Sequence, residues 1–484
     1  MSFELPFKLP NGWTVKTVME LVTDGVIEKP LDGNHGGIHP KSSDYTACGV
    51  PFIMASDLVY GQVDLVNCKF ISNEQAKTLR KGFAKAGDVL ISHKATIGRT
   101  AIVQPSAHDF LVLTPQITYY RIIKKSELSN FYLKCYFDSG YFNSLLSSWA
   151  GAGSTRAYLG ITEQLKLPIV MPPYEEQIKI SNLYSSIQNK LVTNKDINQT
   201  LEQMAQALFK SWFVDFEPVK AKIAVLKTGG SHEDATLAAM TAISGKDADA
   251  LMVFEREHPE QYAELIAMAE LFPSAMQDSE LGEIPKGWHH GPLSSIATFA
   301  EGKVYVSSLT PETYISTENM LENRAGISTA SSLPSVNSVP EFRCGHVLIS
   351  NIRPYFKKIW LARFNGGRSA DVLAFEARDS VTVEYVYNLL YQETFFNFMM
   401  LTSRGVKMPR GDKKAIMGWQ CVLPDKKISD AFSKAVGKYY SFIEINNVQN
   451  KTLTQLRDTL LPKLISGEIT LPEAEQAVSE VENV

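Results

Sequence analysis

The most regular pattern in the chain is a pair of long apolar seams. In residues 173–215, apolar side chains recur at alternating steps of three and four, beginning at Ile180 and ending at Leu208. Residues 425–467 repeat this spacing. An average period of about 3.5 residues is that of a helix in a coiled coil. The pattern therefore predicts two long spacer helices, and we expect their seams to pair antiparallel with each other.

Each seam carries an asparagine at the same place. Asn194 and Asn446 are 252 residues apart, and both fall on the apolar side of their helix. A buried asparagine weakens a coiled coil but fixes its register and its partner. The alternative is that the seam opens at this point and that both amides are solvated.

Shorter apolar runs lie in front of each long helix. Residues 89–91 and 347–349 are Val-Leu-Ile runs that closely follow a glycine, which is typical of buried strands. Residues 131–146 and 385–401 are rich in aromatic side chains at helical spacing. Each long helix is thus predicted to follow a region of mixed strands and helices.

These matched patterns belong to one internal repeat. Leu-Pro-Asn-Gly-Trp at 9–13 returns as Ile-Pro-Lys-Gly-Trp at 284–288, and Gly-Asp-Val-Leu-Ile-Ser at 87–92 returns as Gly-His-Val-Leu-Ile-Ser at 345–350. Further short matches keep the same order, while the offset falls from 275 to 252 residues. Several matches in register predict a duplicated unit of about 200 residues.

The repeat predicts an α+β fold, in which two pseudo-repeated mixed α/β domains are joined by two long antiparallel coiled-coil helices. The linker between the copies has a helical pattern at 236–243 and 262–271. The expected parts of the chain are mixed domain 1 at 1–172, spacer helix 1 at 173–215, an acidic helical linker at 216–280, mixed domain 2 at 281–424, spacer helix 2 at 425–467 and an acidic C-terminal tail at 468–484.

Composition excludes several classes of protein. The 484 residues are 44% hydrophobic and 21% charged, which is typical of a folded globular chain with two to four domains. No apolar run is long enough to span a bilayer, and residues 1–13 lack the features of a signal peptide, so we expect a cytoplasmic protein. Five cysteines without a Cys-x-x-Cys motif predict buried thiols rather than disulfides or a zinc site.

Charge is distributed unevenly along the chain. The net charge is −4, but residues 216–283 carry −8 and residues 468–484 carry −5, so the remainder carries +9. Within that remainder, residues 343–414 hold 12 lysines or arginines against 6 acidic residues. This excess is enough for a nucleic-acid-binding surface, although it is also typical of an ordinary solvated surface.

Three motifs resemble catalytic or metal sites without meeting their requirements. Met-Pro-Pro-Tyr at 171–174 lacks the Asn or Asp with which amino-methyltransferases accept hydrogen bonds from the target amine, so we interpret it as a turn before a helix. His35 and His39 have the spacing of zinc ligands, but the two glycines between them predict a loop. Glu-Gly-Lys at 301–303 is a weak nuclease motif whose repeat partner lacks the lysine. We predict no catalytic residue and no metal ligand.

Together these features resemble the specificity subunit of type I restriction–modification systems. The resemblance covers nearly the whole chain and is carried by the two Pro-x-Gly-Trp motifs, by the two Val-Leu-Ile-Ser strands and by the stretches 172–177, 200–214, 278–288 and 455–469. It implies that the mixed domains are target-recognition domains and that the long helices are conserved spacers that dock modification subunits. The linker at 216–280 departs from a minimal pattern, and its acidity favours a surface appendage over a third reading domain.

Polar and basic loops beside the repeated strands are the candidates for DNA contact. Glycine and serine permit a close approach to phosphate, and arginine and asparagine can read the edges of guanine and adenine. The alternative for each loop is an ordinary solvated turn. The predicted DNA-binding residues are Ser92, Lys94, Thr96, Arg99, Ser154, Thr155 and Arg156 in the first domain, and Ser350, Asn351, Arg353, Tyr355, Lys357, Lys358, Ser403, Arg404, Lys407 and Arg410 in the second.

The sequence is therefore interpreted as a non-catalytic DNA-recognition subunit that reads a bipartite target, with one domain for each half-site. The resemblance implies double-stranded DNA, two modification (methyltransferase) subunits and motor-nuclease restriction subunits as partners. S-adenosylmethionine, ATP and magnesium would belong to those partners, with no cofactor in this chain. The alternatives are a free-standing DNA methyltransferase or nuclease with a duplicated domain, and a coiled-coil scaffold that binds only protein.

Overall fold

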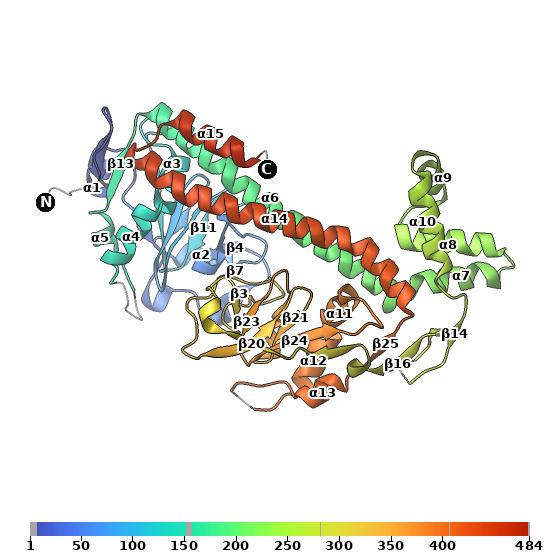
Figure 1. Ribbon diagram of the computed structural model, residues 1–484. Helices are drawn as coiled ribbons and strands as arrows, with labels where there is room; N and C mark the ends of the chain where they lie inside the picture. The colour runs from blue at the N-terminus through green and yellow to red at the C-terminus, as the bar shows by residue number, and fades with distance from the viewer. Residues whose placement is uncertain (1–6, 152–156, 281, 406, 483–484) are drawn as a thin grey trace. The chain divides into compact units, whose positions relative to one another are not determined.

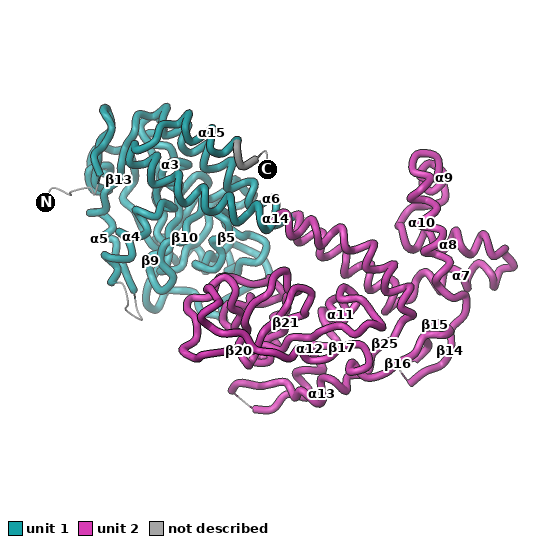
Figure 2. The backbone as a smooth tube through the Cα atoms, in the orientation of Figure 1, with its two compact units in different colours: residues 1–196, 447–484 teal, residues 197–446 magenta. Residues whose placement is uncertain are grey.

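The computed structural model describes residues 7–151, 157–280, 282–405 and 407–482. The chain forms two compact units, unit 1 with residues 1–196 and 447–484 and unit 2 with residues 197–446 (Figure 2). Each unit combines one mixed domain with parts of both long helices. In the part of the chain that the structure describes, none of the helices has both the length and the apolarity of a membrane span.

The described part of the mixed domain in unit 1 contains two packed sheets. Its helices are α1 (Val18–Thr23), α2 (Asn73–Thr78), α3 (Asn130–Asp138), α4 (Gly140–Trp149) and α5 (Ile161–Gln164). The larger sheet has the strand order β2 (Leu31–Asp32), β12 (Ile117–Tyr120), β9 (Val89–Lys94), β10 (Thr96–Ile102), β6 (Gly61–Val63) and β5 (Leu58–Val59). The second has the order β3 (Tyr45–Thr46), β7 (Lys69–Ile71), β4 (Val50–Ile53), β11 (Leu111–Leu113) and β8 (Phe83–Ala84). A separate pair joins β1 (Thr14–Thr17) to β13 (Pro168–Met171).

Strand β9 is apolar at successive positions because both of its faces are buried. Val89 and Ile91 belong to a core that includes the aromatic side chains of α3. Leu90 belongs to the core shared with the second sheet, where it joins Ile53 and Leu113. A central strand that is covered on both sides shows no alternation of apolar and polar residues, as the sequence pattern predicted.

The described residues of unit 2 form a smaller version of this domain. One sheet has the order β17 (Ala297–Phe299), β24 (Val372–Ala377), β21 (Val347–Ser350) and β22 (Ile359–Leu361). The other has the order β18 (Lys303–Tyr305), β20 (Ser338–Phe342), β23 (Gly366–Arg368) and β19 (Tyr314–Ile315). Short pairs join β14 (Met276–Gln277) to β15 (Ile284–Pro285), and β16 (His289–Pro292) to β25 (Gln420–Leu423). The helices are α11 (Val383–Leu390), α12 (Glu393–Leu401) and α13 (Lys413–Met417).

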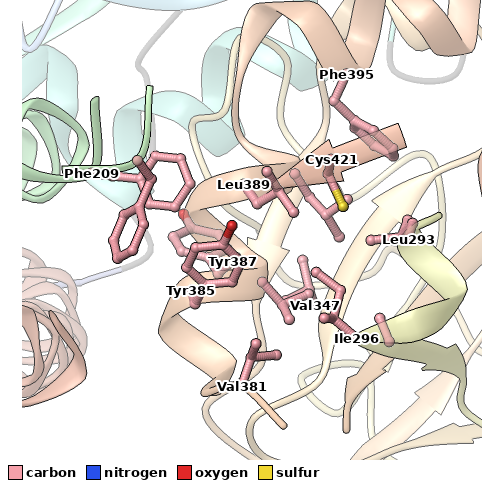
Figure 3. Packing of buried hydrophobic residues seen from close by; sticks show 14 of the residues in the cluster. Phe209, Leu293, Ile296, Val347, Val381, Tyr385, Tyr387, Leu389, Phe395 and Cys421 are labelled. Atoms are coloured by element: carbon pink, nitrogen blue, oxygen red, sulfur yellow. The ribbon is translucent and has the colours of Figure 1, made fainter. Parts of the chain in front are cut away.

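The two mixed domains repeat the same internal bonds. The Tyr132 hydroxyl of α3 donates to the Val170 carbonyl of β13 at 2.9 Å. The Tyr385 hydroxyl of α11 donates to the Val422 carbonyl of β25 at 2.7 Å. In each copy a buried tyrosine thus joins the first helix of the aromatic stretch, α3 or α11, to the strand that leads into a long helix. Figure 3 shows Tyr385 beside Phe209 in the core of unit 2, with their ring centroids 5.4 Å apart.

Each aromatic stretch with helical spacing forms two helices. Ser139 lies between α3 and α4 with extended backbone, and its hydroxyl accepts the Phe142 amide at 3.2 Å as an N-cap. Gln392 interrupts the second stretch between α11 and α12 with extended backbone as well, at ψ 148°, but its side chain makes no capping bond. The periodicity survives these breaks because each short helix still turns an apolar side to the sheet.

The two long helices run antiparallel, as predicted. They are α6 (Tyr174–Phe213) and α14 (Lys426–Ser466), which lie within two residues of the expected bounds. In unit 1, Gln188 accepts a hydrogen bond from Arg457 at 3.2 Å, and Asn194 donates to Asn450 at 3.0 Å. The residue numbers of the partners on α14 thus decrease as those on α6 increase, which is the antiparallel arrangement. Figure 1 shows the two helices side by side. Asn194 is 1% exposed, which excludes the solvated alternative.

The acidic linker is a small helical subdomain. Residues 216–280, all of which the structure describes, contain α7 (Glu217–Lys227), α8 (His232–Ser244), α9 (Ala248–Glu257) and α10 (Pro259–Glu270). The helices α8, α9 and α10 share a core of their own around Met240, Leu251 and Leu265. The ring of Phe272, just beyond α10, packs edge-on against Trp212 of α6 at 5.1 Å.

The C-terminal segment is not an unpacked tail. It forms α15 (Leu471–Glu482), which lies beside α6 and α14 (Figure 1). Ala474 and Val478 are buried against leucines of both long helices, including Leu183 and Leu464. The segment is rich in acidic side chains, but α15 also has an apolar side, which packs against the neighbouring helices.

Candidate nucleic-acid interface

In unit 1 the predicted residues lie on the hairpin of β9 and β10. Lys94, Thr96 and Arg99 are exposed, and Ala95 makes the turn in the left-handed region at φ 66°. Ser92 is buried, and its hydroxyl accepts the Arg99 amide at 2.9 Å across an irregularity in the pairing. Its burial corrects the prediction of direct DNA contact, because Ser92 instead holds the bulge that presents Arg99.

The segment that follows the second predicted loop of unit 1 pairs with this hairpin. Ser154, Thr155 and Arg156 lie outside the described residues. The residues that follow them pair with the hairpin turn, since the Ala95 amide donates to the Ala157 carbonyl at 3.2 Å. Lys94 forms an isolated β-bridge with Tyr158, and its ammonium lies 5.8 Å from the centroid of the Tyr158 ring. Two segments far apart in sequence thus share one surface.

Unit 2 brings its two predicted loops together in the same way. Ile352 forms an isolated β-bridge with Arg410, and the Arg353 amide donates to the Pro409 carbonyl at 2.8 Å. The Ile352–Arg410 bridge is the repeat equivalent of the bridge between Lys94 and Tyr158. The pairing of the two segments therefore occurs in both copies of the repeat and is not specific to one domain.

Two predicted contact residues of unit 2 are buried parts of this framework. The Ser350 hydroxyl donates to the Ile352 carbonyl at 3.1 Å. The Asn351 side-chain amide donates to the Gly411 carbonyl at 3.2 Å, and the Gly411 amide returns a bond to the Asn351 carbonyl. They are 3% and 7% exposed. Their burial corrects the prediction of direct contact, because Asn351 joins the two loops and the Ser350 hydroxyl bonds within its own loop.

The lysines after β21 have partners within the protein. Lys357 forms an ion pair with Glu393 at 2.6 Å, and the Lys358 ammonium donates to the Thr317 carbonyl at 2.8 Å. Hydrogen bonds from Lys357 and then from Arg324 hold the pKa of the Glu393 carboxyl below its usual value. The sequence suggested an open basic cluster, whereas Glu393 balances the charge of Lys357 and a backbone carbonyl holds Lys358.

The backbone turn between Arg353 and Lys357 places one aromatic ring at the surface. Arg353 and Lys357 both adopt the left-handed backbone region at φ 51°, on either side of a short turn. This turn exposes Tyr355, which is 46% accessible, while Arg353 is half-buried. A phenol ring at this position is able to stack on sugar or base.

The second loop of unit 2 carries the more accessible cations. Arg404 and Arg410 exchange two backbone hydrogen bonds at 2.9 Å and form ion pairs with Asp412 and Asp371, respectively. Both arginines are exposed, as is Lys407. Ser403 is half-buried, and its hydroxyl donates to a helix carbonyl at 2.8 Å. The arginines keep donors free, because each guanidinium offers five.

Lys413 and Lys414 are two further cations beside these loops that the sequence pattern did not single out. They begin α13, directly after the loop at 402–411, and both are exposed. Their presence in the basic stretch at 343–414 was the available signal. A helix of five residues is too short to give a periodic pattern, so nothing in the sequence showed where these side chains lie.

The Met-Pro-Pro-Tyr motif and His35 have roles within the fold. Met171 ends β13 and Tyr174 begins α6, so the Met-Pro-Pro-Tyr motif joins a strand to a long helix, as predicted. His35 forms a pair with the buried carboxylate of Asp32 at 2.6 Å, in the segment that precedes a short 3₁₀ turn.

Comparison with known proteins relates the chain to one family. A model of the family described as "Type I restriction modification DNA specificity domain" matches residues 11–203. The chain is 27% identical over 461 residues to the type I restriction enzyme HindI specificity subunit of Haemophilus influenzae, covering 87% of this chain and 94% of that protein. It is 28% identical over 217 residues to the MjaIX specificity subunit of Methanocaldococcus jannaschii, covering 44% and 46%. Among solved structures, the type I restriction–modification S subunit from M. genitalium is similar with a TM-score of 0.45 at 14% identity, covering 94% of this chain and 97% of that one.

Proposed function

We propose that the chain is a type I restriction–modification DNA specificity subunit, as its similarity to such proteins supports, and that it reads a DNA target in two parts, with one mixed domain for each half-site. The observation that carries this proposal is the repeated pairing of loops, Lys94 with Tyr158 in one domain and Ile352 with Arg410 in the other. A duplicated surface with exposed cations fits two similar but separate stretches of DNA.

The side chains on the repeated surface support different half-sites. Lys94 and Tyr158 in the first copy are replaced by Ile352 and Arg410 in the second, although the backbone pairing is the same. Base edges are read by side chains, whereas backbone groups serve mainly to position the protein on phosphate. A common frame with different side chains is therefore suited to two different sequences.

We further propose that the paired long helices dock two modification subunits and that restriction subunits join the assembly. The transferred methyl group would come from S-adenosylmethionine in the modification subunits, and ATP and magnesium would serve the restriction subunits. This chain would contribute recognition and spacing but no catalytic group. A helix of about 40 residues is about 60 Å long at 1.5 Å per residue, which exceeds one turn of DNA.

An exchange of one domain tests the proposal. Residues 281–424 are replaced by the corresponding part of a relative, and methylated sites are mapped for the complex assembled with modification subunits. We expect one half of the target to change and the other half to remain. A change in both halves would show that the domains read jointly. If the complex binds its protein partners but leaves no footprint on DNA, the scaffold alternative is favoured.

The catalytic alternative has its own test. The purified chain is incubated with duplex DNA and labelled S-adenosylmethionine, and separately with magnesium. We expect neither methylation nor cleavage until modification or restriction subunits are added. Turnover by the chain alone would favour a free-standing methyltransferase or nuclease.

A further inference from the structure

Lys413 and Lys414 directly follow the residues that join the paired loops of unit 2. The Gly411 amide bonds to the Asn351 carbonyl, and α13 begins two residues later. Asp412 caps this helix by accepting the backbone amides of Lys414 and Ala415 at 2.9 and 3.1 Å. Figure 1 shows α13 directly after the loop at 402–411. The two lysines are thus held in place by the residues that join the loops.

Their charges are not balanced within the protein. Among the residues that the structure describes, no carboxylate lies within 4.0 Å of either ammonium group, whereas Lys357, Arg404 and Arg410 each have one. The Lys413 ammonium lies 5.9 Å from the centroid of the Phe299 ring. A cation–π contact at this distance orients an ammonium group without neutralising it.

The two lysines border a shallow hollow of about 490 Å³. Its lining consists of Ser294, Phe299, Lys413, Lys414, Met417 and Gly418. This set supplies two cations and a hydroxyl around an apolar wall, and it contains no acidic side chain. Lysine binds phosphate as a point charge, and serine hydroxyls also donate to phosphate oxygens. The chemistry therefore suits an anion joined to an apolar group, as in a sugar–phosphate chain.

The equivalent positions of the first domain carry no lysine. Under the 252-residue offset, Ile161 and Thr162 of α5 stand at the positions of the two lysines. The next residue of α5, Glu163, forms an ion pair with Lys166 at 3.0 Å. The lysine pair is therefore not required by the shared framework and belongs to the function of the second domain alone.

We propose that Lys413 and Lys414 bind the phosphate backbone of double-stranded DNA at the hollow beside Phe299. This inference rests on the proposed function and adds to it a positioning site for the second domain. The contacts would be with phosphates rather than bases, so they strengthen binding to every sequence about equally. They also make the second domain contribute more than the first to the salt dependence of binding.

The test compares two double variants of the full chain. Lys413→Gln with Lys414→Gln removes the proposed contacts. Lys426→Gln with Lys427→Gln removes an equal charge from another adjacent, exposed pair at the start of a helix in the same unit. Binding to a short mixed-sequence duplex is measured by fluorescence anisotropy between about 50 and 200 mM salt. Thermal melting of each variant confirms that it is folded.

We expect the first variant to lower the slope of log affinity against log salt by up to about two and to weaken binding roughly tenfold at low salt. The single variant Lys414→Gln should lose about half of that slope, and the control pair should match the wild type. An unchanged slope in the first variant, or an equal loss in the control, would overturn the inference while leaving the proposed function intact. A wild-type chain without salt-dependent binding to the duplex would overturn both.

Discussion

The side-chain amide of Asn194 donates to the side-chain oxygen (Oδ1) of Asn450 across the paired helices at 3.0 Å. Asn446 donates to Asn198 at 2.8 Å. The second bond is the image of the first under the 252-residue offset, because Asn194 corresponds to Asn446 and Asn198 to Asn450. The seam thus places the same polar pair twice among apolar side chains, which favours one antiparallel register over its alternatives.

We expect Asn194→Ala to destabilise the chain by about 1–3 kcal/mol, because it leaves polar groups of Asn450 without their buried partner. Asn446→Ala should have a smaller effect, because Asn194 also donates to Gln449 at 2.8 Å, whereas the repeat equivalent of Gln449 is the apolar Ile197. Replacement of both Asn194 and Asn450 by leucine should recover part of the loss, because the Asn194–Asn450 pair is then removed whole and only the side-chain oxygen of Gln449, which accepts from Asn194 at 2.8 Å, loses its donor. Urea denaturation of the four proteins measures these differences, and a double variant as unstable as the single one would contradict the explanation.

The carboxyl of Glu202 should make stability fall with rising pH. Burial away from water raises its pKa from 4.5 to about 7, although hydrogen bonds from Gln206 and Tyr387 and the charge of Arg363 act in the opposite direction. A folded-state pKa above the unfolded value means that stability is complete below the unfolded pKa. It is then lost as the pH rises from about 4.5 through about 7.

Glu202→Gln should therefore match the wild type near pH 4.5 and exceed it above pH 7, by at most about 3 kcal/mol. Denaturation at a series of pH values gives the difference between the two proteins at each pH. Glu175→Gln, which alters an exposed side chain of the same helix, is the control. A constant difference between wild type and Glu202→Gln across this range would show that the carboxyl does not titrate there.

Lys357→Ala should change DNA binding little. Its ion pair with Glu393 already balances its charge, and Glu393 keeps Arg324 as a second partner at 3.0 Å. We expect a loss of stability of at most about 1 kcal/mol and almost no change in the salt slope of DNA binding. Lys94→Ala, which removes an exposed cation without a carboxylate partner among the described residues, should lower the slope by about one. A similar loss in Lys357→Ala would mean that phosphate displaces Glu393.

Val478→Asp should release α15 from the paired helices. Val478 is 6% exposed within a cluster of leucines, so an aspartate there loses apolar burial and places a charge in an apolar site. Hydrogen exchange of the amides in residues 471–479 should become much faster, while the mixed domains keep their protection. Glu475→Ala, an exposed change on the same helix, is the control. Equal protection in Val478→Asp would show that α15 is held by other contacts.

Several features of this protein follow from the sequence alone. The seam spacing predicted both long helices within two residues of their observed bounds. The repeat predicted two mixed domains on one framework, and the asparagine at the same place on each seam predicted a buried amide there. These inferences hold because helical periodicity and internal repetition are properties of neighbouring positions and of one chain compared with itself.

The candidate interface depended on the tertiary structure. Ser92 and Asn351 looked like exposed loop residues, but the fold buries them and uses their hydrogen bonds to join strands and loops. Lys357 looked like a free cation, but Glu393, which belongs to a separate helix, lies 2.6 Å from it. Whether a polar group meets water, a carbonyl or an opposite charge depends on which distant segments the fold brings within hydrogen-bonding reach. That proximity is set by backbone turns such as the left-handed residue at Arg353, which no local pattern of hydrophobic and polar residues specifies.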